Sequence, residues 1–158
     1  GAAHGAYNAG ERLIKLNESS MENYGEMTLI HEYGHHLTLG ERGEGKTEFL
    51  SRIMGDPELK EWWGAVKATP QFAKFAKFES SVEATALQRD YASYLKDPRE
   101  MFARSYSQWI AVRSGDAGLI EQHERSRVET GGDYQWSAKE FEPIGAALDK
   151  WFEKEGMR

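Results

Sequence analysis

The pentad His31-Glu32-Tyr33-Gly34-His35 is the part of this sequence best suited to chemistry. On an α-helix, residues four apart lie one above the other, so His31 and His35 could bring two imidazoles to one metal ion. In the HExxH pattern, the glutamate between them takes a proton from a metal-activated water. The pentad therefore predicts a metal site that performs hydrolysis. A helix with two structural or surface histidines is the simpler alternative.

A catalytic zinc site usually has three protein ligands, so a third must come from elsewhere. One class of HExxH protein has a histidine six residues after the second one, but this sequence has Thr38 and Glu41 at the two positions that define that longer pattern. Glu100 is a better candidate because it begins a second long predicted helix. Glu41 and Glu83 remain alternatives, and Glu100 could instead close a capping box with Asp97.

Two helices must position these residues. Apolar residues at helical spacing predict one helix from residue 22 or 26 to residue 39, with Gly40 directly after its end. Gly34 costs this helix about 1 kcal/mol relative to alanine, which indicates that another segment approaches its backbone there. Asp97 as N-cap and Pro98 at the first helical position predict the start of the helix with Glu100, which extends to about residue 113.

The remaining pattern is also mainly helical. Helices are predicted over residues 47–54, 57–68, 70–78, 80–95, 119–128 and 137–155, with a turn at 131–133. Residues 12–17 form the only convincing strand. The predicted fold class is therefore mainly α (α+β), with a short N-terminal edge strand and several packed helices. The aromatic residues at helical spacing are predicted to form core: Trp62, Trp63, Phe72, Phe75 and Phe78.

Composition excludes several other classes of protein. The 158 residues suit a single domain, and the net charge of −6 argues against a nucleic-acid-binding protein. We find no signal peptide and no apolar run long enough for a membrane span, and the cellular location stays open. Because the chain has no cysteine, a metal site must use His, Asp or Glu. The opening Gly1-Ala2-Ala3, with Met21 as the first methionine, predicts an excerpt from a longer chain that could supply other domains.

Three segments resemble the gluzincin-type metallopeptidases and, more loosely, the small zincin domains attached to phage head proteins and bacterial toxins. In that group a strand borders the cleft, one helix carries HExxH, and a glutamate in a later E-x-F-A-R helix is the third ligand. The resemblance implies that His31, His35 and Glu100 hold Zn²⁺ and that Glu32 is the catalytic base. It is carried by residues 7–16, by Thr28-Leu29-Ile30 and His36-Leu37 around the pentad, and by Asp97-Pro98-Arg99-Glu100-Met101-Phe102-Ala103-Arg104-Ser105-Tyr106.

The expected function is a zinc-dependent metalloendopeptidase acting on a protein or peptide, which could add to the 12–17 strand through backbone hydrogen bonds. The same ligands would accept manganese, cobalt or nickel. Tyr106 is the first choice as donor to the developing oxyanion, ahead of Tyr91 and Tyr94, although packing is the simpler role for each.

Two other functions stay open. One is a catalytically inactive zincin-fold module with a structural or protein-binding role in a phage particle or toxin. The other is a helical interaction domain in which the pentad arose by chance. Among the other histidines, His36 is expected at the surface or beside a ligand, and His4 and His123 are expected to be ordinary surface residues.

Overall fold

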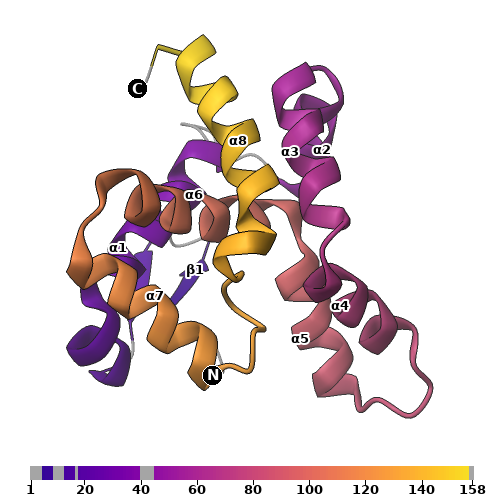
Figure 1. Ribbon diagram of the computed structural model, residues 1–158. Helices are drawn as coiled ribbons and strands as arrows, with labels where there is room; N and C mark the ends of the chain where they lie inside the picture. Colours follow the sequence, from indigo (N-terminus) through magenta and orange to yellow (C-terminus); the bar gives the residue numbers. More distant parts are fainter. Residues whose placement is uncertain (1–4, 9–12, 17, 40–44, 157–158) are drawn as a thin grey trace.

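A computed structural model describes residues 5–8, 13–16, 18–39 and 45–156. These residues are mainly helical, as the sequence predicts (Figure 1). None of the described helices is both long and apolar enough to cross a membrane. In chain order the elements are β1 (Gly5–Asn8), β2 (Leu13–Leu16), α1 (Glu18–Leu39), α2 (Lys46–Met54), α3 (Pro57–Lys67), α4 (Pro70–Ser80), α5 (Ala86–Lys96), α6 (Pro98–Ser114), α7 (Ala117–Glu129) and α8 (Ala138–Lys154).

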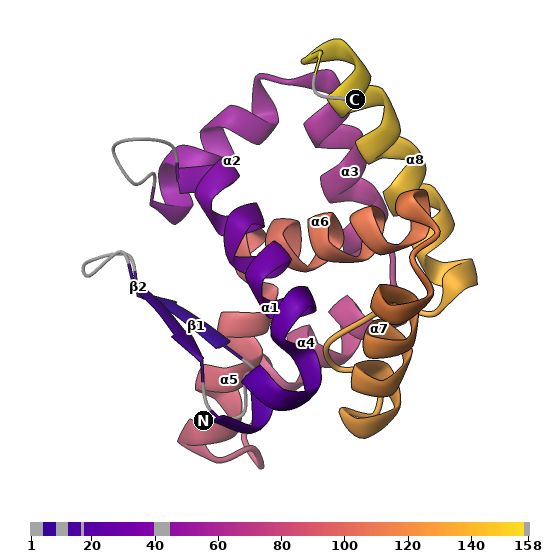
Figure 2. The ribbon, with the colours of Figure 1, turned by 90° about the vertical axis from the view of Figure 1, so that its left-hand side faces the viewer.

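The two strands form an antiparallel hairpin in which Gly5 lies opposite Leu16 and Asn8 lies opposite Leu13. Strand β2 falls within the predicted strand at 12–17, but β1 was not predicted. Glycine, alanine and asparagine in β1 have weak β propensity, so this segment carries no clear strand signal. The backbone pairing with β2 stabilises this strand instead. Figure 2 shows the hairpin alongside α1.

Helix α1 is interrupted at Tyr24, whose backbone angles (φ −136°, ψ 24°) are not helical. The portion that carries the pentad therefore begins as a new helix just after this residue. Helix α7 supports its start: the Tyr24 hydroxyl donates to Glu129, and the Met27 amide donates to the Gln122 side chain at 3.2 Å. This donor near the N-terminus of a helical segment would otherwise lack a partner. The predicted cap Gly40 lies outside the described residues.

Most predicted helices are confirmed to within a few residues, and Asp97 caps α6 through the Arg99 amide as expected. The predicted helix at 80–95 is wrong at its start, because residues 81–85 connect α4 to α5. Thr85 and Gln88 form a capping box, in which the Thr85 hydroxyl accepts from the Gln88 amide and the Gln88 side chain accepts from the Thr85 amide. This box begins α5 six residues after the predicted start.

Helix α6 runs through the middle of the molecule and crosses α1 at close range (Figures 1 and 2). At the crossing, a Cβ atom added to Gly34 would lie 2.8 Å from the Ala103 Cα, so only glycine allows this approach. The close approach predicted at Gly34 is therefore confirmed. Around α6 the core includes Trp62 and Phe75, as predicted, whereas Phe78 is 40% exposed and lies outside the core. Phe78 lies near the C-terminal end of α4, two residues before its last residue.

Candidate metal centre

The α1–α6 crossing brings the two pentad histidines to the carboxylate of Glu100. The His31 Nε2 atom lies 3.2 Å from Glu100 Oε1, and the His35 Nε2 atom lies 2.8 Å from Glu100 Oε2. Ligand atoms of all three residues lie within 4.8 Å of one another. The three residues are nearly inaccessible, with 2%, 7% and 1% of their surface exposed. This buried His–His–Glu group could hold a metal ion.

Two of the separations within this group can be compared with those between the ligands of a small metal ion. Ligand atoms about 2.0–2.1 Å from a tetrahedral zinc ion lie about 3.3 Å from one another. The 3.2 Å separation between His31 and Glu100 is close to this value, and the 2.8 Å separation between His35 and Glu100 is somewhat shorter. Glu100 also does not close a capping box with Asp97, because its carboxylate is directed towards the histidines of α1.

Burial and the neighbouring groups shift the pKa values of His31 and Glu100. Burial lowers the pKa of His31 below its ordinary value despite the neighbouring Glu100. Burial by itself would raise the pKa of Glu100, but the two imidazoles outweigh it and bring this pKa well below the ordinary carboxyl range. A neutral imidazole and an ionised carboxylate are the forms that bind metal ions.

Glu32 is buried beside the group and has a carboxyl with unusual properties. It is 2% exposed, and neither oxygen has a hydrogen-bond partner among the described residues. Burial raises its pKa to about 7, an effect that His35 opposes and Glu100 reinforces. A buried carboxyl without a partner is rare in folded proteins. With a pKa near neutrality, Glu32 could both accept and release a proton there.

The structure brings Tyr94, rather than Tyr106, to the metal group. The Tyr94 hydroxyl donates to Glu100 Oε2 at 3.0 Å. Tyr106 lies six residues after Glu100, about 120° around the helix. Its ring packs against Tyr33, and also against Trp109 and Phe152. Packing therefore accounts for the position of Tyr106. The polar contact with the metal group is made by Tyr94, which the sequence indicated only as a lesser candidate.

Tyr134 is a neighbour of the centre that the sequence did not predict. Its ring stacks on His31, with centroids 5.7 Å apart and an interplanar angle of 26°. The residue follows the turn at Gly131 and Gly132, both of which have positive φ. Apart from that glycine turn, nothing in the local pattern points to this position, because the contact crosses about a hundred residues of sequence.

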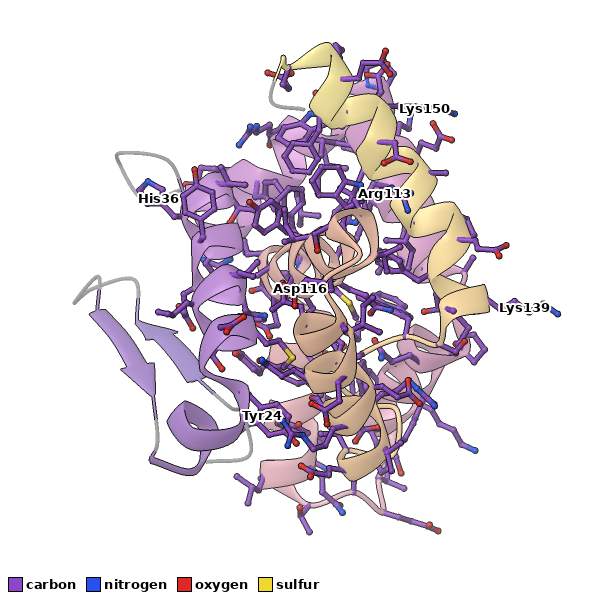
Figure 3. The ribbon with its side chains drawn as sticks, turned by 60° about the vertical axis from the view of Figure 1, so that its left-hand side comes forward. Tyr24, His36, Arg113, Asp116, Lys139 and Lys150 are labelled. Atoms are coloured by element: carbon purple, nitrogen blue, oxygen red, sulfur yellow. The ribbon has the colours of Figure 1, made fainter. Side chains whose placement is uncertain are left out.

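The described metal group contains neither of the alternative glutamate ligands and no further histidine. Glu83 is exposed in the connection between α4 and α5 and is not part of the group. Glu41 and His4 lie outside the described residues. His36 is exposed on the outer side of α1, where Figure 3 shows it away from the interior.

His123 corrects the prediction of a surface residue. It is 5% exposed on the inner side of α7, and its Nδ1 and Nε2 atoms lie 2.9 Å from the Leu119 carbonyl and the Ser107 hydroxyl. It occupies a face of α7 that also buries Leu119 and Ser126. The three- and four-residue spacing of these positions was the available signal.

Comparisons with protein families, with curated proteins and with the solved structures give no match for this chain.

Proposed function

We propose that this protein is a zinc-dependent metalloendopeptidase of the zincin type. The observation that carries the proposal is the convergence of His31 and His35 from α1 with Glu100 from α6. Glu32 directly follows His31 on α1. Three nitrogen or oxygen ligands from protein side chains are the number that catalytic zinc sites use. Without cysteine, the chain offers a donor set that suits zinc but would also accept other divalent transition metals.

The residues of the chain have separate roles in this proposal. His31, His35 and Glu100 would hold the ion, which would supply Lewis acidity for activating water and polarising a peptide carbonyl. The Glu32 carboxylate accepts the proton of the attacking water and passes it to the leaving amine, which its pKa of about 7 favours. Tyr94 holds Glu100 in place through a hydrogen bond that uses its single O–H proton.

The β1–β2 hairpin supports a peptide substrate. Each strand pairs with one neighbour among the described residues, so each also has an edge free of a described strand. An extended peptide can add to such an edge by main-chain hydrogen bonds. Flexible or unfolded segments of protein are the substrates that suit this mode, because a folded segment does not offer its backbone.

One observation favours the second candidate, a catalytically inactive module that keeps the metal for structure or for protein binding. The three ligands are between 1% and 7% exposed, and Glu32 is 2% exposed, so a substrate would need an opening to reach them. Buried closed sites are typical of structural zinc.

The test is zinc content and peptide cleavage in the purified chain, in the wild type and in Glu32→Gln. The proposal expects about one zinc per chain in both proteins, cleavage of a flexible-peptide library by the wild type, and loss of cleavage in Glu32→Gln. His31→Ala is the metal-free control. A wild type that binds zinc and cleaves no peptide supports the inactive module, and a wild type without zinc refutes both candidates.

A further inference from the structure

Arg104, one turn after Glu100 on α6, is a second charged residue at the centre of the molecule. Its side chain is completely buried. Burying a guanidinium costs several kcal/mol unless its charge and its N–H donors are satisfied. The surroundings of Arg104 therefore show what the fold gains from placing it there.

The two terminal nitrogens of Arg104 tie α6 to three other segments, one of which is α4, where Nη1 donates to the Gln71 side chain at 3.3 Å. Nη1 donates to the backbone carbonyls of Asp133 at 2.9 Å and Tyr134 at 3.1 Å, and Nη2 donates to the carbonyl of Leu95 at 2.7 Å. The guanidinium also lies over the ring of Tyr134, 5.5 Å from its centroid. One side chain thus holds the end of α5, which carries Tyr94, and the segment in which Tyr134 stacks on His31.

The third nitrogen of Arg104 faces the metal group. Its Nε atom lies 3.7 Å from Glu100 Oε1. Both atoms are buried, and neither has a hydrogen-bond partner among the described residues. The separation is a few tenths of an ångström beyond a hydrogen bond, so a small movement of either side chain would close it. Glu100 also supplies the negative charge that the carbonyl acceptors of Arg104 lack.

We propose that Arg104 is the positioning residue of the metal centre, whose guanidinium fork orients Glu100 and fixes the segments carrying Tyr94 and Tyr134 against the ligands. The proposal rests on the metal centre of the proposed function and deepens it. Groups that hold a ligand's free atoms often contribute as much as 10- to 100-fold to metal affinity. Arg104 would act in this way through the ligand from α6 and, by way of Tyr134, through His31 from α1.

Charge and geometry can be separated, because they predict opposite effects. A cation close to Glu100 repels a metal ion, so a purely electrostatic role predicts tighter zinc binding when the charge is removed. The fork predicts weaker binding when its planar geometry is lost. Arg104→Lys keeps the charge and removes the fork, since an ammonium cannot reach these acceptors in the same arrangement.

Arg113→Lys is the matched control. It makes the same change on the same helix, at a guanidinium that pairs with both carboxylate oxygens of Asp149, at 2.7 and 2.6 Å. This pair links α6 to α8 and involves no residue of the metal group. Arg113 is labelled in Figure 3.

The experiment measures zinc affinity of the full chain by competition with a chromophoric chelator, at a temperature where circular dichroism shows each variant folded. The expected result is zinc binding at least about tenfold weaker in Arg104→Lys and unchanged in Arg113→Lys. A merely structural Arg104 would lower the melting temperature and leave the zinc affinity of the folded protein at the wild-type value. That result would overturn the positioning role of Arg104. The metal centre of the proposed function would still stand, because the wild type would bind zinc. A wild type that binds no zinc overturns both.

Hydrogen exchange of the wild type provides a second measurement that needs no variant, should Arg104→Lys fail to fold. If Arg104 connects the centre to the 133–136 segment, added zinc slows amide exchange in that segment as well as in α1. Slower exchange in α1 with no change in residues 133–136 would overturn the proposal.

Discussion

Replacing Gly34 by alanine tests whether the α1–α6 crossing determines both stability and metal binding. The added Cβ would lie 2.8 Å from the Ala103 Cα and 3.2 Å from the Ala103 carbonyl oxygen. Both are backbone atoms in the middle of α6, so no side chain can rotate away. The two helices must instead separate by several tenths of an ångström. His35 follows Gly34 directly, and Glu100 lies one turn before Ala103, so the ligands separate as well.

Two opposing free energies determine the size of the effect. Alanine in place of glycine stabilises a helix interior by about 1 kcal/mol. Overpacking of a close contact costs about 1–3 kcal/mol. Gly64→Ala isolates the first contribution, because Gly64 is an exposed residue inside α3 and a Cβ there meets nothing within 4 Å. The difference between the two variants is then the overpacking cost alone, about 1–3 kcal/mol less stability for Gly34→Ala.

The assay is urea unfolding followed by circular dichroism, with a chelator present so that zinc contributes nothing, together with a zinc titration of each variant. We expect Gly64→Ala to be more stable than the wild type and to bind zinc with unchanged affinity. Gly34→Ala should bind zinc about tenfold more weakly, since ligands must be held to within about 0.5 Å. The reasoning fails if Gly34→Ala is as stabilised as Gly64→Ala and binds zinc as the wild type does.

Three further predictions follow from the site and its surroundings. Zinc at about 100 times its Kd should raise the free energy of unfolding by about 2.7 kcal/mol, and in His35→Ala this gain, measured by thermal or urea unfolding with and without a chelator, should disappear. Tyr94→Phe removes the hydroxyl that donates to Glu100 and should weaken zinc binding about tenfold in the chelator competition, whereas an unchanged affinity would show that this hydrogen bond does not hold the ligand. Burial lowers the pKa of His123 to about 4 from an ordinary 6.5, so the unfolded chain takes up a proton that the native protein resists. The native state should therefore keep this contribution above pH 6.5 and lose about 3 kcal/mol as the pH falls to 4, and a His123→Asn variant, compared by urea unfolding at each pH, should lack that loss.

The sequence by itself determined much of the local structure. Helical spacing and caps predicted most helices, including the start of α6 at Asp97 and Pro98, because these signals act over a few residues. The pentad predicted that two imidazoles share one side of a helix, and Gly34 predicted a close approach there. These are properties of one helix and need no information about its neighbours. Where local signals competed, as between Ser80 and Thr85, the prediction of a continuous helix was wrong.

Only the tertiary structure decided which residues complete the site. Glu100 lies 65 and 69 residues from His35 and His31, and its side chain meets them because α1 and α6 cross at Gly34 and Ala103. The phase of α6 at that crossing directs Glu100 inward and leaves Tyr106 among aromatic rings, while α5 presents Tyr94. The buried places of Arg104 and His123 have the same origin. Crossing position and helix phase depend on the packing of the whole core, and no short stretch of sequence encodes them.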